Sequence, residues 1–163
     1  MNAVTPSAYA PDLQGLIQAL AEAVGDDGLK DPFLPVQWSA LAPYLQQVTL
    51  AAGQTLFTRG AHERTLYLIE SGSLSAHYED EKARLRMAII GSGSIVGEST
   101  FFSHRPRIAT VQAAAASKLW GLSSLRFTEL SNRQPALALG LTMAAGSVLA
   151  RRLNNRRLRV AAT

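Results

Sequence analysis

The 163-residue sequence predicts a mainly β domain with flanking helices. Between residues 49 and 122, short runs with period-two alternation are separated by turn-forming residues. On both sides of this region, apolar residues recur at helical spacing instead. A hydrophobic content of 47% with 17% charged residues is ordinary for a globular domain with a full core. We therefore expect an antiparallel sandwich or jelly roll with helices at both ends.

The first expected element is a helix within residues 1–34, which we interpret as an N-terminal extension. Its apolar positions recur at helical spacing, at Leu13, Leu16, Ile17, Leu20, Ala23 and Val24. The segment 25–28, Gly-Asp-Asp-Gly, ends this helix. A second short helix is expected at residues 38–45, immediately before the β region.

The strands of the β region are delimited by turn signals. These signals are Gly53, Gly60, Ser71-Gly72, the acidic turn at 79–81 and the segment 91–93. The core residues that we expect are Leu66, Leu68, Ile89, Val111 and Leu119.

After Leu122 the pattern becomes helical again. Ser123 is a suitable cap for a short helix over 125–130, and a long helix follows from Pro135 to about Val160. The long helix carries an apolar seam made of Leu141, Val148, Leu149, Leu153 and Val160. This seam either joins two copies of the chain in a homodimer or packs on the helix's own domain. We interpret residues 135–163 as a dimerisation and lid element.

Five arginines gather at the end of this helix and supply much of the net charge of +4. They are Arg151, Arg152, Arg156, Arg157 and Arg159. Such a cluster can bind nucleic acid or an acidic partner, or it can form a solvated surface that complements the helix dipole. We favour the solvated surface.

The most informative segment is 97–111. Glu98 follows the turn-forming Gly97 and can accept a hydrogen bond from a sugar hydroxyl. Arg107, nine residues later, offers a planar fork of donors to a phosphate. Residues 99–103 can form one short helical turn whose free N–H groups also face an anion. The pairing suits a ligand that carries both a diol and an anionic group.

This segment resembles the phosphate-binding cassette of the cyclic nucleotide-binding domain family, which includes the catabolite activator protein. The matching positions are Gly97-Glu98, Pro106-Arg107, Ile108-Ala109 and Thr110-Val111, at the family's spacing. Similarity continues outward through 53–57, 66–72 and 91–95, so that it covers about residues 35–158.

The resemblance implies a double-stranded β-helix barrel over residues 35–134. It also implies that Glu98 holds a ribose 2′-hydroxyl, while Arg107 and the cassette backbone hold a cyclic phosphate. The ligand-binding residues carried over are Gly97, Glu98, Ser99, Arg107, Ile108 and Ala109. Arg156 and Arg157 lie where relatives place a residue that reads the purine base, and are candidate base contacts.

Three functions fit this resemblance. The first is a stand-alone bacterial signal-transduction receptor for cyclic AMP or cyclic GMP, which acts on an unidentified partner protein through a ligand-dependent shift of the C-terminal helix. The second is a ligand-independent dimeric scaffold or adaptor of the same fold. The third is a receptor for cyclic di-GMP, in which the helix-end arginines contact phosphate or guanine.

Other classes of function are not expected. The sequence has no cysteine, and its three histidines, His62, His77 and His104, show no ligand spacing, so neither a metal site nor a cofactor is expected. No nucleophile is paired with a base, which argues against an enzyme. Since the chain ends at Thr163, shortly after the long helix, we expect no helix-turn-helix and no direct DNA binding. Without a recognisable leader or membrane span, a cytoplasmic location is expected.

Overall fold

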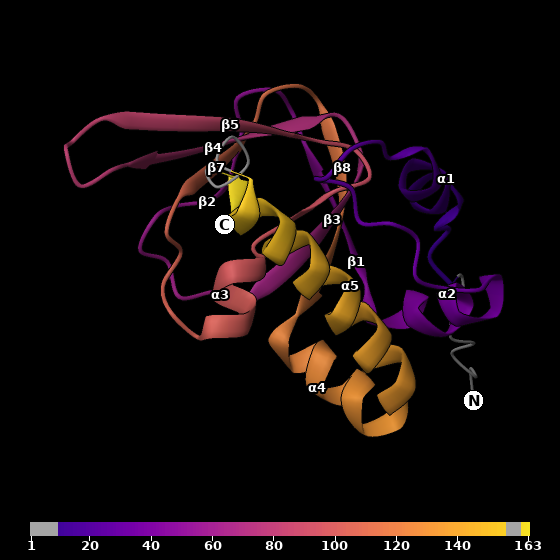
Figure 1. The fold of residues 1–163 in the computed structure, drawn as a ribbon. Helices are drawn as coiled ribbons and strands as arrows, with labels where there is room; N and C mark the ends of the chain where they lie inside the picture. The colour runs from indigo at the N-terminus through magenta and orange to yellow at the C-terminus, as the bar shows by residue number, and fades with distance from the viewer. Residues whose placement is uncertain (1–9, 156–160) are drawn as a thin grey trace, which may run out of the picture.

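The computed structural model describes residues 10–155 and 161–163, which form two facing antiparallel sheets with helices around them (Figure 1). The first sheet has the order β1-β8-β3-β6, with bounds Gln46–Leu50, Ser117–Ser123, Thr65–Ser71 and Ile95–Val96. The second has the order β2-β7-β4-β5, with bounds Thr55–Phe57, Thr110–Ala113, Ser73–Glu79 and Leu85–Gly91. The predicted mainly β jelly roll with flanking helices is confirmed.

Strand β3 contains four successive apolar residues, at positions 66–69, because both of its faces are buried. Tyr67 and Ile69 point into the barrel, while Leu66 and Leu68 pack on the opposite face against the helices. A strand buried on both faces needs apolar side chains at successive positions. Leu66, Leu68, Val111 and Leu119 are buried, as the sequence predicts.

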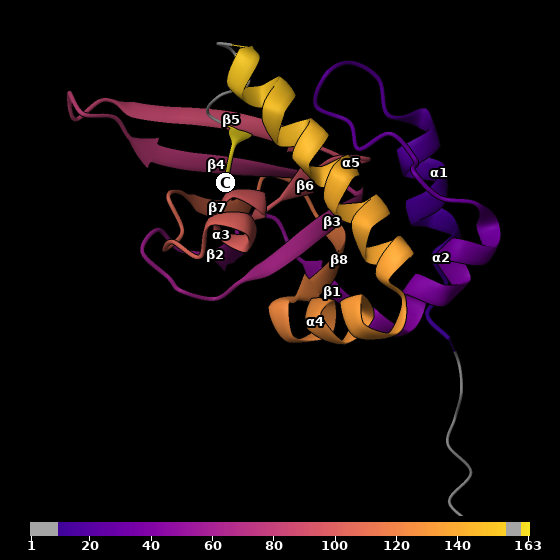
Figure 2. The same cartoon turned by 60° about the horizontal axis from the view of Figure 1, so that its bottom comes forward.

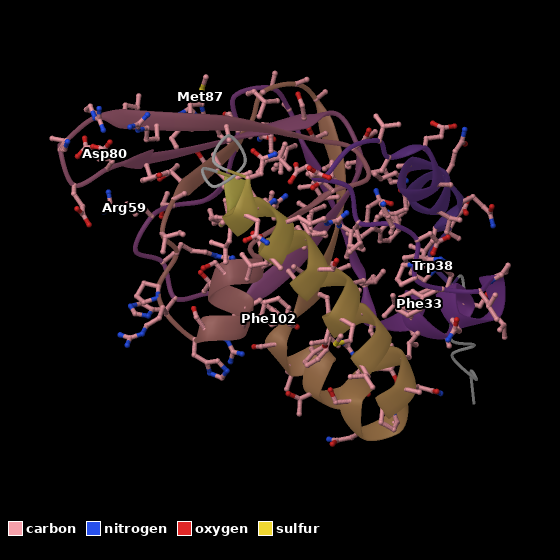
Figure 3. The ribbon with its side chains drawn as sticks, in the orientation of Figure 1. Phe33, Trp38, Arg59, Asp80, Met87 and Phe102 are labelled. Carbon is pink, nitrogen blue, oxygen red and sulfur yellow. The ribbon has the colours of Figure 1, made fainter. Side chains whose placement is uncertain are left out.

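Ile89 does not belong to the core, and its prediction is wrong. Its side chain is 57% exposed, whereas its neighbour Ile90 is fully buried in the barrel. Successive side chains of a strand point to opposite faces, so only one of two adjacent isoleucines can point inward. Leu85 and Met87 are also exposed and share the outward face with Ile89. Figure 3 shows Met87 on this outward face.

The N-terminal helices cover the outer side of the first sheet (Figure 2). They are α1, Gln14–Glu22, and α2, Pro35–Leu41, followed by the 3-10 turn η1, Ala42–Tyr44. Both predicted helices are present. Trp38 anchors α2 to the segment that precedes it. Its Nε1 donates to Asp31 Oδ1 at 2.9 Å. Its ring lies edge-on to the Phe33 ring, with 5.1 Å between the ring centroids (Figure 3).

The C-terminal helices are α4, Ser124–Arg133, and α5, Pro135–Asn154. Ser123 caps α4 as predicted, because its side chain accepts the Arg126 N–H. Helix α5 ends earlier than predicted, because Asn155 has an extended backbone with φ −101° and ψ 111°. Residues 156–160, the remainder of the predicted helix, lie outside the described residues.

Helix α5 crosses the molecule beside α4 with one face buried (Figures 1 and 2). Leu141 and Val148, predicted for a seam, are 1% and 0% exposed and pack in their own domain. By length and composition alone, α5 is apolar enough to cross a membrane, whereas no membrane span is expected from the sequence. The core helix of a globular domain can have the same length and composition. Its buried face and its buried Arg152 are those of a helix packed on a domain.

The outward face of α5 carries a second apolar stripe. Leu139 and Met143 are 62% and 66% exposed, and a Cβ added to Gly146 would meet open space. Ala150 and Leu153 continue the stripe, so that its members alternate at four- and three-residue spacing.

Candidate ligand-binding site

The cassette begins with a glycine that no other residue can replace without strain. Gly97 has a φ of 86°, in the left-handed region. A Cβ at this position would lie 2.5 Å from Arg107 Nη1 and 2.6 Å from the Thr65 carbonyl oxygen. Helix α3, Glu98–Ser103, starts directly after it, close to the predicted short helical turn. The absence of a side chain at Gly97 therefore lets the Arg107 guanidinium lie against the Gly97 backbone.

Arg107 is 1% exposed and lies against the cassette backbone. Its Nη1 donates to the Gly97 carbonyl oxygen at 3.1 Å, and its Nη2 donates to the Thr65 carbonyl oxygen at 2.9 Å and to Glu63 Oε2 at 2.7 Å. Its Cζ stands 3.9 Å from the centroid of the Phe57 ring. Its Nε has no hydrogen-bond partner among the described residues. The guanidinium is thus positioned by its surroundings, with one buried donor unused.

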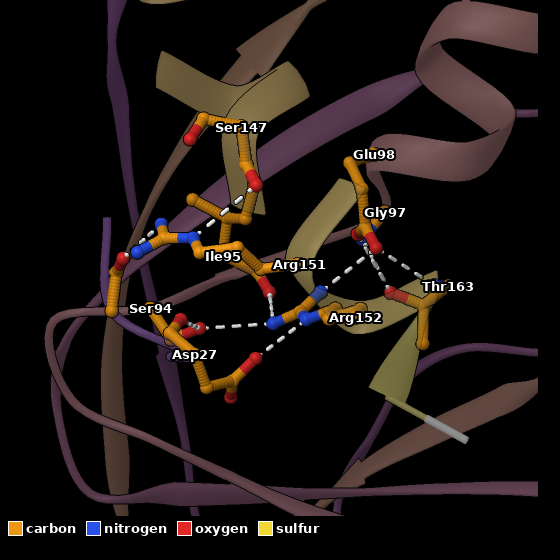
Figure 4. Close-up of polar contacts among 10 residues, drawn as sticks. Asp27, Ser94, Ile95, Gly97, Glu98, Ser147, Arg151, Arg152 and Thr163 are labelled. Carbon is orange, nitrogen blue, oxygen red and sulfur yellow. Dashed lines mark hydrogen bonds and ion pairs between the residues drawn. The ribbon is translucent and has the colours of Figure 1, made fainter. Parts of the chain in front are cut away.

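Glu98 is fully buried, with both carboxylate oxygens bonded (Figure 4). Its Oε1 accepts Arg152 Nη1 at 2.8 Å and the Thr163 main-chain N–H at 3.1 Å. Its Oε2 accepts the Thr163 hydroxyl at 3.1 Å. Burial raises the pKa of Glu98, and the positive charge of Arg152 opposes this shift. The carboxylate predicted to hold a ligand hydroxyl is therefore engaged by the chain itself.

The partner of Glu98 corrects one expectation. We expected Arg152 on a solvated surface, but it is fully buried. Its Nε donates to Asp27 Oδ1 at 2.5 Å, and its Nη2 to Ser94 Oγ at 2.9 Å and to the Ile95 carbonyl oxygen at 2.8 Å (Figure 4). Burial lowers the pKa of Arg152, but the carboxylates of Glu98 and Asp27 outweigh it and leave that pKa raised.

Arg152 was missed as a site residue although a signal for it exists. It lies four residues after Val148 and eleven after Leu141, on the same buried face of α5 as Ala145. A charged residue on a buried helix face needs a buried partner. Its neighbour Arg151 is only half-buried, and its Nη2 donates to the Gly28 carbonyl oxygen at 2.8 Å.

Residues 161–163 cover the cassette. Thr163 is 0% exposed and Ala161 is 1% exposed, within the apolar interior of the barrel. The Gly97 N–H donates to Thr163 Oγ1 at 2.7 Å (Figure 4). The Ser99 N–H donates to the Thr163 main-chain oxygen at 2.7 Å. Three of the predicted ligand-binding residues are thus bonded to a residue that sequence reasoning did not single out.

The other predicted residues are placed as follows. Ala109 is fully buried, and Ile108 is 46% exposed. His104 ends α3 at a φ of 58°, with its Nε2 3.0 Å from Arg64 Nη2. Arg156 and Arg157, the candidate base contacts, lie outside the described residues, as does Arg159 of the basic cluster.

A cleft of about 770 Å³ lies along the first sheet, and its lining contains no residue of the cassette 97–111. Its lining includes Tyr44, Val48, Lys118 and Trp120. Trp120 Nε1 and Lys118 Nζ both bond the Glu70 carboxylate, at 2.6 and 3.0 Å. These polar groups already satisfy one another, so we locate the candidate site at the cassette.

Comparison with known proteins agrees with this geometry. The family model for the cyclic nucleotide-binding domain matches residues 47–134, a span that includes the cassette. The cAMP-dependent protein kinase regulatory subunit of Eremothecium gossypii is 25% identical over 126 residues, which are 77% of this chain. The aligned region spans only 27% of that kinase subunit.

Solved structures share the fold. A cyclic nucleotide-binding domain from Methylobacillus flagellatus superposes with a TM-score of 0.75 at 21% identity, over 87% of this chain and 78% of that one. The catabolite activator protein of Thermus thermophilus superposes with a TM-score of 0.67 at 26% identity, over 81% of this chain and 61% of that one. The match of the family model to more than half of the sequence, together with the cassette described above, shows that this chain belongs to the cyclic nucleotide-binding domain family.

Proposed function

We propose that this chain is a receptor for cyclic AMP or cyclic GMP. Glu98 would hold the ribose 2′-hydroxyl, and Arg107 with the cassette backbone would hold the cyclic phosphate. One observation carries the proposal: the buried guanidinium of Arg107, with its unused Nε, and the buried carboxylate of Glu98 belong to the same short segment. Burying two charged side chains carries a desolvation cost even where partners offset part of it, and a packed barrel requires neither charge. The name of the kinase regulatory subunit supports a cyclic nucleotide as the ligand.

The output of the receptor would be a movement of α5. Arg152 ties α5 to Glu98, the residue assigned to the ribose. A nucleotide that takes the Glu98 oxygens competes with this ion pair and shifts the population toward a displaced α5. A partner protein in the cytoplasm would bind the displaced helix. The chain itself would not contact DNA directly.

The outward stripe of α5 supports a homodimer. Leu139 and Met143 expose apolar surface on a helix face with coiled-coil spacing, and Gly146 leaves room for a close approach. Dimerisation through this stripe replaces the role first assigned to Leu141 and Val148, which are buried in their own domain.

A second candidate is a scaffold or adaptor that binds no nucleotide. It is favoured by the engagement of both Glu98 oxygens within the chain, because a nucleotide would have to displace these bonds. A cyclic di-GMP receptor is a third candidate and rests on Arg156 and Arg157.

Isothermal titration with cyclic AMP, cyclic GMP and cyclic di-GMP at physiological salt separates these functions. We expect saturable binding of cyclic AMP or cyclic GMP, weakened about 100-fold or more in Arg107→Ala because charge-assisted hydrogen bonds to the phosphate are lost. Arg105→Ala is the matched control, since Arg105 is exposed two residues away. Thermal unfolding establishes that both variants are folded. No heat from any of the three nucleotides with folded protein would favour the scaffold, and heat from cyclic di-GMP alone would favour the third candidate.

A further inference from the structure

The three residues at 161–163 use the same cassette groups that the proposed function assigns to the nucleotide. Thr163 bonds the N–H groups of Gly97 and Ser99 and both carboxylate oxygens of Glu98. Thr163 is 65 residues from Glu98 and 66 residues from Gly97 in the sequence. The contact is therefore a tertiary one that closes the site.

We propose that residues 161–163 act as a tethered inhibitor of the nucleotide site, which must leave the cassette before a nucleotide binds. This inference rests on the proposed function, because it assigns the same atoms to both occupants.

The chemistry of Thr163 matches that of the expected ligand. A hydroxyl carries one donor and two acceptor positions. Thr163 Oγ1 accepts the Gly97 N–H and donates to Glu98 Oε2, which is the bond assigned to a ribose hydroxyl. The Thr163 main-chain oxygen accepts the Ser99 N–H, a bond suited to a phosphate oxygen. Each N–H group has one hydrogen to donate, so Thr163 and a nucleotide compete for it.

The side chains of this segment also fit the barrel. Ala161 is 1% exposed and packs among the interior residues, which include Phe57, Val96 and Val111. A methyl side chain fills this position without displacing its neighbours, whereas a longer charged side chain could not be buried there without cost. Position 161 therefore offers a way to eject the segment without shortening the chain.

Ejection of the segment would reach α5 through the shared carboxylate. Glu98 accepts both Thr163 and Arg152, so a nucleotide that displaces Thr163 also acts on the atom that holds α5. The apparent Kd for a nucleotide equals the intrinsic Kd divided by the fraction of molecules whose site is open. If about one molecule in ten is open, removing the segment tightens binding about 10-fold.

The test compares four proteins: the full chain, a chain that ends at residue 160, Ala161→Glu, and the control Ala52→Glu. Ala52 is exposed in the turn between β1 and β2, so its variant adds the same charge without touching the site. Titration with cyclic AMP and cyclic GMP measures affinity. Amide hydrogen exchange without nucleotide measures protection of the Gly97 and Ser99 N–H groups.

We expect the shortened chain and Ala161→Glu to bind about 10-fold more tightly than the full chain, and to lose protection at Gly97 and Ser99. Ala52→Glu should behave as the full chain in both measurements. Equal affinities across the four proteins would overturn this inference and leave the proposed function standing. The same holds if the Gly97 and Ser99 amides exchange as fast in the full chain as in the shortened chain. Absence of binding in all four folded proteins would overturn the proposed function and, with it, the competition.

Discussion

Replacing Arg152 by methionine removes the cation that neutralises the buried carboxylate of Glu98 and the partly buried carboxylate of Asp27. The guanidinium donates to Asp27, Glu98, Ser94 and the Ile95 carbonyl oxygen. Methionine fills much of the same volume but satisfies none of these acceptors. Glu98 would then be a buried carboxylate with donors only from the main chain and Thr163.

The magnitude follows from the burial of both partners, since the side chains of Arg152 and Glu98 are each 0% exposed. Breaking a buried ion pair on one side costs about 3–5 kcal/mol. For a chain of this size that loss lowers Tm by about 10 °C. Burial already raises the pKa of Glu98, and loss of Arg152 removes the main opposing charge. The variant therefore binds a proton more readily when folded, so its deficit should shrink as the pH falls and grow as the pH rises.

The assay is urea unfolding followed by fluorescence of Trp38 and Trp120, with Arg151→Met as the control. Arg151 is only half-buried and meets no carboxylate in the described structure, so its variant should lose about 1 kcal/mol or less. Adding Glu98→Gln to Arg152→Met should restore part of the loss, because the uncompensated charge is gone. A loss below about 1 kcal/mol for Arg152→Met, or one equal to the control, would show that the buried ion pair does not stabilise the fold in this way.

Three further predictions concern other parts of the molecule. Gly97→Ala should lower the free energy of unfolding by about 1–3 kcal/mol and weaken nucleotide binding, because φ is 86° and the new Cβ would lie 2.5 Å from Arg107 Nη1; chemical unfolding and titration measure the two effects. The main-chain N–H of Arg84, with other donors, lowers the pKa of Asp80 from 3.8 to about 2. The stability that this carboxylate contributes is present above pH 3.8 and should be lost as the pH falls through 2. Tm measured against pH should therefore fall less in Asp80→Asn than in the parent chain. Met143→Glu should convert a dimer to a monomer in light scattering with Tm otherwise kept, and a monomeric parent chain would exclude the α5 stripe as an interface.

The fold and half of the site follow from local sequence patterns. Gly97, Glu98 and Arg107 were found because they lie within one short segment with fixed spacing. The strands and helices were found because period two and helical spacing differ. Ile89 was misassigned because alternation cannot say which of two adjacent isoleucines points inward, and the neighbouring strand decides it.

The rest of the site depends on contacts between distant segments. Arg152 meets Glu98 across 54 residues, and Arg107 meets Glu63 across 44. The buried face of α5 carried a signal for Arg152, because its spacing continues that of Val148. Thr163 carried none, because a threonine after two alanines matches no motif. Its place at the cassette depends on the packing of Ala161 and on its hydrogen bonds to Gly97, Glu98 and Ser99.

The most direct test of a nucleotide site closed by the chain itself is an amide chemical-shift map recorded during titration with cyclic AMP or cyclic GMP. We expect the largest shifts at Gly97, Ser99 and Ala109, and we expect the signals of residues 161–163 to move to positions typical of unfolded peptides as Thr163 leaves. Shifts confined to the cleft lined by Trp120, or saturation of the site with the Thr163 signal unchanged, would show that the nucleotide does not displace this segment.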